Sequence, residues 1–415
     1  MPKASIVIPC YNAERFVEES VASAQAQVVR DIEIICVDDG SNDKTLAILK
    51  QLAAKDERIR VLEQPNGGEG PARDAGLCAA TGDWLYFLDA DDIMGPNLLE
   101  EAIACGEREQ ADVVVFRTTM LDDQTGEQYA CEWSFKHDWL EGTTFCPREH
   151  PEHVFNSFQN WVHNKLFRGS FVREHNLHMQ HVHRTADLLF TCRALAEAER
   201  IALLDMPLYL YRVNNAQSAM ATSDLYPLDF FKAFAALRAA LEESGAWTLY
   251  HDSFVNWTIE GIAVNLRYAR SYETYRAIAD HLEREGFEQL DIVDFPREKS
   301  DMPNYYDQIR PLVEGEAQQT LFRIAEAFRA EQATAQTSLS AAHVKLDELT
   351  GKLEEAQEQA HDAIAERDER IAELEAELEE QRHAFACATS STSFRIGRAA
   401  TFVPRTVVGL LRRRS

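Results

Sequence analysis

Trp84-Leu85-Tyr86-Phe87-Leu88-Asp89-Ala90-Asp91-Asp92 is an apolar run that ends in three carboxylates. The apolar part is typical of a buried strand. Three carboxylates within four residues repel one another unless a cation or a base lies nearby. Their hard oxygen atoms suit Mg²⁺ or Mn²⁺, which proteins usually share with a diphosphate. The alternative is a solvated acidic loop.

Outward from this run, the first 116 residues alternate predicted strands and helices. Such units predict an α/β fold with a parallel, doubly wound sheet, which binds ligands beyond the carboxyl ends of its strands. The other predicted strands are Ile6–Ile8, Ile32–Val37, Arg60–Leu62 and Val113–Phe116. The predicted helices carry apolar stripes over Val17–Val28, over Leu46–Ala53 with Ser41 or Asn42 as the N-cap, and over Leu98–Cys105 with Pro96 at the first turn.

Two further loops follow strands of this sheet. Asp38-Asp39-Gly40-Ser41 could accept hydrogen bonds from a nucleotide, or form a plain turn before a helix. Asn66–Gly76 is glycine-rich, but its spacing and its place after the third strand do not fit a dinucleotide fingerprint. We interpret it as a flexible loop leading into a helix that carries Arg73, which could brace a phosphate or a carboxylate or pair within the fold.

These loops, with Ser5–Asn12 at the first strand, resemble the family 2 glycosyltransferases with the GT-A fold. Asp74 stands where that family usually has Asn. The resemblance covers about residues 1–225 and implies a Rossmann-like, mostly parallel sheet flanked by helices. The matching positions are Pro9, Tyr11, Asn12 and Glu14; Asp38-Asp39-Gly40-Ser41 with Asp43; Asn66, Gly68, Ala72, Arg73 and Gly76; and Phe87–Asp92.

The resemblance implies a nucleotide-sugar site built from these positions. Asp39 would accept the N–H of a uracil or similar base, and Pro9 and Tyr11 would line the base pocket, although Tyr11 could simply pack at a strand end. Asp91, with Asp89 nearby, would hold Mn²⁺ or Mg²⁺. The other residues expected to contact the nucleotide-sugar are Asn12, Glu14, Asn66, Arg73, Asp89 and Ala90.

The likeness continues through Asn164-Lys165-Leu166-Phe167 and Pro207–Arg212. Between these segments the family usually has Glu-Asp, and its Asp is the catalytic base. This chain has Ala186-Asp187. The resemblance therefore implies that Asp187 is the general base of a direct displacement that inverts the anomeric centre.

The implied function is an inverting, metal-dependent glycosyltransferase that uses a nucleotide-sugar, a UDP-sugar being favoured. The acceptor would be a glycan or a lipid-linked molecule in cell-surface polysaccharide or glycoconjugate synthesis. A nucleotidyltransferase is one alternative, although such enzymes usually carry a basic, glycine-rich loop where this chain has Pro9-Cys10-Tyr11-Asn12. A coiled-coil scaffold with an inactive transferase head is the other, and the retained Asp39, Asp89, Asp91 and Asp187 disfavour it.

Histidines and cysteines give weaker signals. His175, His178, His181 and His183 precede Asp187 and could bind a metal or a phosphate, but a polar loop is the commoner case. None of the eight cysteines forms a CxxC pair, which favours buried free thiols in a reducing compartment. No signal peptide or membrane-spanning run is visible, so we expect a cytoplasmic protein.

Charge is unevenly distributed along the 415 residues, whose formal net charge is −27. This total excludes nucleic-acid binding through a generally basic surface. Residues 345–382 contain 14 acids and 5 bases, whereas residues 383–415 contain six arginines and no acid. The apolar and arginine-rich tail could lie on an anionic membrane at the inner face, or it could be disordered or dock on a partner.

Composition and motifs predict five segments. Residues 1–116 form the nucleotide-sugar-binding half and 117–225 the acceptor and catalytic half of the GT-A domain. A helical region (226–330), a coiled coil (331–385) and a basic amphipathic tail (386–415) follow. Leu346, Leu349, Leu353, Ala356, Ala360 and Ala363 follow one heptad, and Ile364, Ile371, Leu374 and Leu378 follow another after a stutter. We expect a homo-oligomer through this coiled coil, with a single solvated helix as the alternative.

Overall fold

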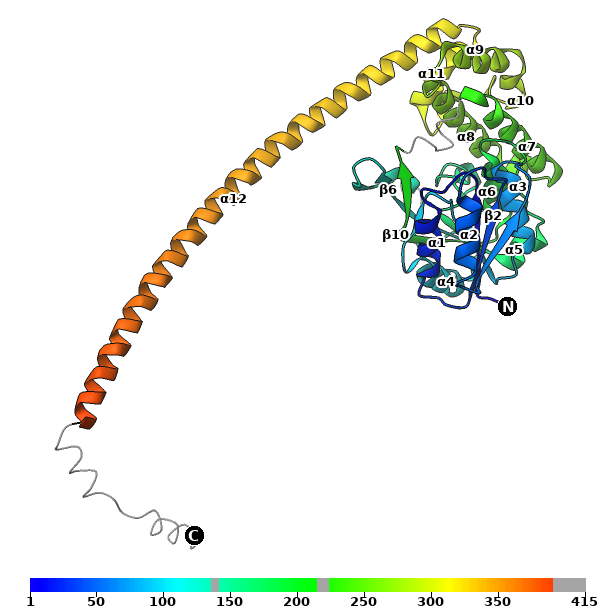
Figure 1. Ribbon diagram of the computed structural model, residues 1–415. Coiled ribbons are helices and arrows are strands. Elements are labelled where there is room, and N and C mark those ends of the chain that lie inside the picture. The colour runs from blue at the N-terminus through cyan, green and yellow to red at the C-terminus, as the bar shows by residue number, and fades with distance from the viewer. Residues whose placement is uncertain (136–141, 215–223, 391–415) are drawn as a thin grey trace, which may run out of the picture. The chain divides into compact units, whose positions relative to one another are not determined.

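The computed structural model describes residues 1–135, 142–214 and 224–390, the last of these ranges with side chains described only in part beyond residue 325. Its centre is one mixed sheet (Figure 1). The strands in spatial order are β3 (Ile59–Glu63), β2 (Ile32–Asp38), β1 (Ala4–Cys10), β4 (Trp84–Phe87), β9 (Lys165–Arg168), β6 (Val113–Asp122), β10 (Ile201–Val213) and β5 (Ile93–Met94). Two short strands extend it: β7 (Gln128–Ala130) pairs with β6, and β8 (Thr144–Phe145) pairs with β10.

The predicted mostly parallel sheet is confirmed, with one strand reversed at its centre. Strands β1 to β4 are parallel, and so are β6 and β10. Between these two sets, β9 runs antiparallel to both β4 and β6. Cys10 at the end of β1 pairs with Asp38 at the end of β2, so the loops that follow these strands lie at one edge.

Helices cover the sheet. Those of the first half are α1 (Val17–Gln25), α2 (Thr45–Ala53), α3 (Glu69–Ala79) and α4 (Leu98–Arg108), followed by α5 (Gly169–Glu174) and α6 (Ala186–Glu197). The predicted cap of α2 is wrong, because Lys44 occupies the N-cap position and Ser41 accepts the backbone N–H of Asn12. Pro96 likewise lies outside α4, whose N-cap is Asn97.

Alternating strand residues divide the core into two layers. On β4, Trp84 and Tyr86 face the layer that contains α1 and α4, whereas Leu85 and Phe87 face the layer that contains α5 and α6. The central strands are therefore apolar on both faces, which explains why they are nearly continuous hydrophobic runs.

The expected helical region is present after the sheet. It consists of α7 (Asp229–Glu243), α8 (Trp247–Arg267), α9 (Tyr272–His281), a π-helical turn (Leu282–Gly286), α10 (Phe287–Gln289), α11 (Pro303–Val313) and the start of α12 (Ala317–Ser390). Its apolar side chains join the α6 layer of the core. By contacts the chain divides into residues 1–325 and 326–415. Among the described helices, none is long and apolar enough to cross a membrane.

Candidate functional site

The loops after β1 and β2 brace each other. Asn12 has a left-handed backbone (φ 48°), and its Oδ1 accepts the N–H of Asn42 at 2.8 Å. Glu14 Oε2 accepts the N–H of Lys44 at 3.0 Å. Tyr11, by contrast, is 49% exposed. Asn12 and Glu14 therefore shape the loop through these hydrogen bonds, whereas the side chain of Tyr11 is exposed.

Asp39 links the β2 loop to the glycine-rich loop. Its carboxylate accepts the N–H groups of Gly67 at 2.9 Å and Gly68 at 2.8 Å, and the side-chain amide of Gln64 at 2.8 Å. These bonds use about three of the four acceptor positions of a carboxylate. Asn66 donates its side-chain amide to the Asp39 carbonyl. Asp39 and Asn66 therefore fix the loop that leads into α3, and a base contact by Asp39 stays a prediction.

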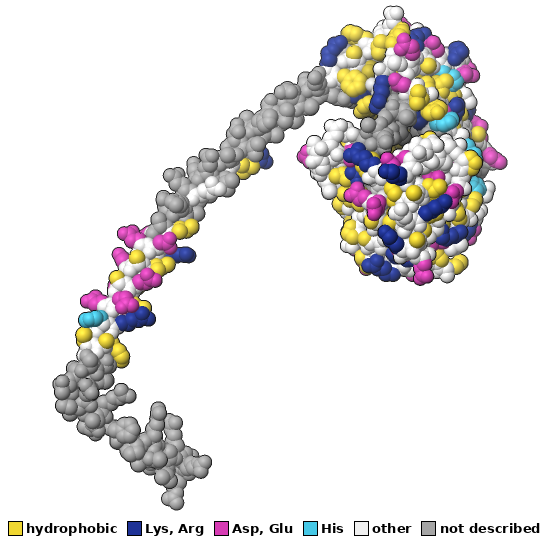
Figure 2. Space-filling model, in the orientation of Figure 1, with side chains coloured by type: hydrophobic (Ala, Val, Ile, Leu, Met, Phe, Trp, Pro, Cys, Tyr) yellow, Lys and Arg dark blue, Asp and Glu magenta, His cyan; other side chains and the backbone are white. Residues whose placement is uncertain are grey.

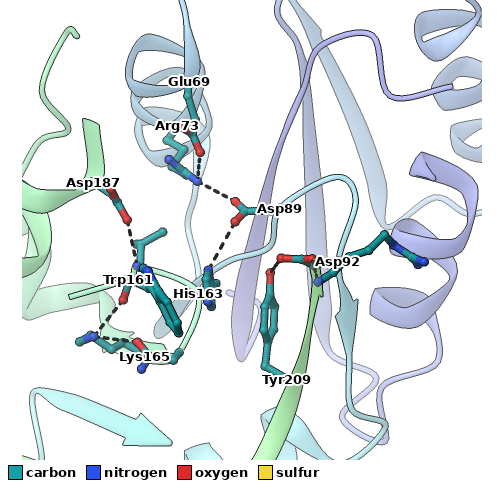
Figure 3. Close-up of polar contacts among 12 residues, drawn as sticks. Glu69, Arg73, Asp89, Asp92, Trp161, His163, Lys165, Asp187 and Tyr209 are labelled. Atoms are coloured by element: carbon teal, nitrogen blue, oxygen red, sulfur yellow. Dashed lines mark hydrogen bonds and ion pairs between the residues drawn. The ribbon is translucent and has the colours of Figure 1, made fainter. Parts of the chain in front are cut away.

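A partly buried charge cluster forms where α3 meets the end of β4 (Figure 3). Arg73 is 2% exposed and donates to Asp89 at 2.6 Å, and it also pairs with Glu69. Burial alone would raise the pKa of Asp89, but Arg73 and then His163 hold it well below its usual range. Burial, together with nearby Asp89 and Asp187, raises the pKa of Glu69 in spite of Arg73. Nε and Nη1 of Arg73 are buried and have no hydrogen-bond partner within the described residues.

Asp92 has a different role from Asp89. Its Oδ2 accepts the Tyr209 hydroxyl and its Oδ1 accepts the Arg212 N–H, both at 2.6 Å. Burial, Asp91 and Asp89 raise its pKa well above the usual value. Asp92 therefore ties the β4 turn to β10.

His163 completes the cluster from the segment before β9. Its Nδ1 lies 3.4 Å from Asp89, and its ring stacks 4.4 Å from that of Tyr209. Burial lowers the pKa of His163, which favours the neutral ring that can bind a metal. Its Nε2 is buried and has no partner within the described part of the chain. His163 was not predicted from the sequence, although it directly precedes the Asn164-Lys165 motif.

One group of metal-ligand side chains is found among the described residues: Asp89, Asp92 and His163, with ligand atoms within 4.8 Å of one another. Both oxygens of Asp92 accept hydrogen bonds at 2.6 Å, and both oxygens of Asp89 are paired with Arg73 and His163, whereas Nε2 of His163 has no partner among the described residues. Asp91, predicted as a ligand, lies in the same turn, where its carbonyl accepts Nε of Arg212 at 2.7 Å. A donor set of carboxylate and imidazole suits Mn²⁺ better than Mg²⁺, which prefers oxygen ligands alone. The ligand role of Asp91 stays a prediction.

Asp187 is linked to the cluster of Asp89 and His163 through the segment that contains His163. It lies in the first turn of α6, after Thr185, whose φ of 56° is unusual for a β-branched residue. Its Oδ2 accepts the N–H of Val162 at 3.3 Å. Val162 is the neighbour of His163, so one short segment touches both sequence-predicted carboxylates, Asp89 and Asp187 (Figure 3).

Lys165 holds that segment from within. Its ammonium is fully buried and donates to the carbonyls of Gln159 at 2.6 Å and Trp161 at 2.9 Å, and to Oδ1 of Asn164 at 2.7 Å. Trp161 stacks on the rings of Tyr211 and His163. Residues 159–164, which we call the bridging loop, therefore have a backbone fixed by one lysine and aromatic rings packed on β10. The sequence analysis found Lys165 within a motif but missed this role.

The other histidines do not gather at the site. His175 pairs with Glu197, His178 and His181 with Asp74, and His183 lies near Asp229. Each imidazole thus lies near a carboxylate of another element, and His178 and His181 share Asp74 of α3. The four histidines do not form a metal-ligating group within the described residues. Asp74, at the position where the family usually has Asn, accepts the N–H of Met179 and anchors this loop to α3.

Comparison with known proteins identifies the family of one segment of the chain. The family model described as glycosyl transferase family 2 matches residues 5–175. This segment belongs to glycosyl transferase family 2. In sequence, the uncharacterised glycosyltransferase EpsJ of Bacillus subtilis is 34% identical over 52% of this chain and 62% of its own length. The poly(ribitol-phosphate) beta-N-acetylglucosaminyltransferase TarS of Staphylococcus aureus is 27% identical over 59% of this chain and 42% of its own.

The GT-A fold is confirmed by solved structures. The crystal structure of S. aureus TarS 1–349 in complex with UDP-GlcNAc superposes with a TM-score of 0.57 at 20% identity. The likeness covers 79% of this chain and 92% of that one. At this identity the likeness shows the fold. The covered share is larger than the family 2 segment, so the likeness extends beyond residues 5–175.

Proposed function

We propose that the protein is an inverting glycosyltransferase that moves a sugar from a UDP-sugar, with Mn²⁺ or Mg²⁺ bound, to a glycan or lipid-linked acceptor of a cell-surface polysaccharide. The observation that carries the proposal is the bridging loop, which contacts Asp89 on one side and Asp187 on the other. Asp89 follows the strand end where the donor is expected. Asp187 stands across the loop from it and is available to the acceptor.

Under this proposal each residue of the site has a separate role. Asp187 accepts the proton of the acceptor hydroxyl as the new bond to the anomeric carbon forms. Arg73 and His163 would face the departing diphosphate. Nε and Nη1 of Arg73 are buried and have no hydrogen-bond partner within the described residues. Asp89, Asp91 and His163 would hold the divalent ion, which when bound neutralises charge on the leaving group. The bound ligand of TarS supports a UDP-sugar donor, with UDP-GlcNAc as the first candidate.

Asp187→Asn tests the base. We expect UDP release from UDP-GlcNAc with poly(ribitol phosphate), the acceptor that the TarS relatives suggest, to fall by about 100-fold or more. Binding of UDP-GlcNAc with Mn²⁺, measured by thermal shift, should stay nearly unchanged. Asp205→Asn, at an exposed acid of β10 paired with Arg117, is the matched control and should transfer normally. Normal transfer by Asp187→Asn would refute the assignment of the base.

His163→Ala tests the metal site. We expect UDP-GlcNAc to raise the melting temperature of the chelated protein only after Mn²⁺ or Mg²⁺ is added. His163→Ala should weaken the Mn²⁺ dependence by about 10-fold or more, because an imidazole ligand is lost. His175→Ala, at an imidazole paired with Glu197, is the control. Equal donor binding with and without the ion would contradict the metal role.

The same assays separate the alternatives. A nucleotidyltransferase would release pyrophosphate from a nucleoside triphosphate and would not respond to Asp187→Asn as described. An inactive head would bind no UDP-sugar. Release of UDP that depends on the acceptor supports the transferase.

A further inference from the structure

Hydrophobic side chains are exposed among charged ones on the described part of α12 (Figure 2), and four aliphatic residues of it form what we call the aliphatic stripe. Ile364, Ile371, Leu374 and Leu378 are 53%, 44%, 47% and 49% exposed. Ile364, Ile371 and Leu378 are seven residues apart, and Leu374 lies three residues after Ile371. Ile364, Ile371 and Leu378 therefore occupy a positions of heptads and Leu374 occupies a d position. All four lie on one face of the helix. Burying an aliphatic side chain is favourable, and a solitary helix leaves these four side chains in water.

Charges beside the stripe define how a partner helix would align. Arg370 and Glu377 occupy g positions, and Glu375 and Arg382 occupy e positions. In a parallel, in-register pair each g residue faces the e residue five positions further along the other helix. Arg370 would then face Glu375, and Glu377 would face Arg382. Both pairings are opposite in charge, and the two-fold symmetry doubles each of them.

The apolar positions select the same alignment. In a parallel pair Ile364, Ile371, Leu374 and Leu378 each pack against their own copies, and the polar d residues Arg367 and Gln381 meet their own copies in separate layers. An antiparallel pair packs a positions against d positions, and the neighbouring d residues are Arg367 and Gln381. Each antiparallel register that overlaps the stripe therefore sets at least one aliphatic a residue against Arg367 or Gln381. Isoleucine at a with leucine at d also favours two strands over three or four.

We propose that residues 364–382 of α12 pair with the same residues of a second copy of this chain, as a parallel, in-register, two-stranded coiled coil. The occupant of the stripe is thus another copy, identified by its self-complementary charges and its matched aliphatic layers. The assembly carries two transferase domains. This pairing is independent of the proposed function, because an inactive head would dimerise equally well.

Sedimentation velocity of the full chain tests the pairing. We expect a dimer at micromolar concentration. Arg370→Glu places like charges opposite each other twice and should weaken the dimer by about 10-fold or more. Adding Glu375→Arg to that variant reverses both partners and should restore the dimer. A monomer or a trimer of the wild-type chain, or a double variant weaker than Arg370→Glu alone, would overturn the proposal.

Disulfide cross-linking tests orientation and register. In a chain with Ser at the exposed Cys78 and Cys387, Ile371→Cys places two thiols at one a layer and should give a cross-linked dimer upon oxidation. Ala376→Cys, at the outward f position of the next heptad, is the matched control and should remain uncross-linked. Equal cross-linking of both variants, or none by Ile371→Cys, would contradict a parallel, in-register pair.

Discussion

Lys165 shows how one side chain can organise a site that it does not enter. It lies on β9, fully buried, and donates to three oxygens of the bridging loop. Burial lowers the pKa of Lys165 to about 7. Only the ammonium form has three hydrogens for the three acceptors. The position of Trp161 and His163 therefore depends on a buried cation that faces no carboxylate directly.

Lys165→Met, which keeps the length of the chain but removes the donors, should lower the free energy of unfolding by about 2–4 kcal/mol because it leaves buried oxygens unsatisfied. The loss should depend on pH. The pKa of Lys165 is about 7 when folded and 10.5 as a free side chain, so between these values the unfolded wild-type chain binds more protons. The contribution of Lys165 to wild-type stability then rises with pH, by at most about 1.4 kcal/mol per unit.

Urea unfolding at pH 7.5 and pH 9 measures this dependence. The difference between wild type and Lys165→Met should be larger at pH 9, and groups other than Lys165 cancel in that difference. A difference that is constant with pH would show that the lysine keeps its proton in the folded chain.

Residue types at strand ends revealed part of the site, and spatial contacts supplied the rest. Asp89 and Arg73 were predicted, because a carboxylate and an arginine stand out beside apolar strands, and Asp187 was predicted from the resemblance to the family 2 glycosyltransferases. His163 and Trp161 were not, because a lone imidazole and a lone indole carry no spacing signal. Their significance comes from β9, which returns antiparallel beside β4 and brings the bridging loop to Asp89.

At the scale of elements, glycine sets how closely α3 approaches the segment before α6. A Cβ at Gly70 would lie 2.2 Å from the carbonyl oxygen of Gln180, and that carbonyl belongs to backbone. Gln180 in turn donates its N–H to the carbonyl of Ala186, next to Asp187. The distance between Arg73 on α3 and Asp187 on α6 therefore depends on the absence of one side chain.

Gly70→Ala should force these two elements apart. We expect a loss of about 1–3 kcal/mol in stability, typical of overpacking, together with at least a 10-fold loss of transfer. Gly126→Ala is the matched control. Its Cβ would meet no atom within 4 Å, although its φ of +72° adds backbone strain. Urea unfolding and UDP release measure the two effects, and equal transfer by the two variants would contradict the argument.

The elements themselves were largely predictable. Strands that are buried on both faces are continuous apolar runs, and this is why β1, β2 and β4 were recognised. The antiparallel β9 was missed, because Leu166 and Phe167 form a run too short to be separated from a motif. Pairing direction depends on which strands β9 lies between, and that information is spread across the chain.

At the scale of the whole molecule, charge is separated along the chain. Residues 1–344 carry −24 and residues 345–382 carry −9, whereas residues 383–415 carry +6, which together give −27. The last 25 residues lie outside the described part of the chain. Their sequence nevertheless combines six arginines with Phe394, Phe402 and aliphatic residues. An acidic protein is repelled by an anionic membrane, so any attraction has to come from this end.

Deleting residues 391–415 should abolish binding to anionic vesicles. Each arginine near such a surface contributes about 1 kcal/mol, and the aromatic and aliphatic side chains add burial at the interface. The full chain should therefore pellet with phosphatidylserine vesicles and much less with phosphatidylcholine vesicles, and salt should weaken the binding. If the full and the deleted chain pellet equally, the tail does not hold the protein at a membrane.

A two-stranded α12 would present two tails per assembly, so Arg370→Glu, which weakens the pairing, should also weaken pelleting with the tail intact.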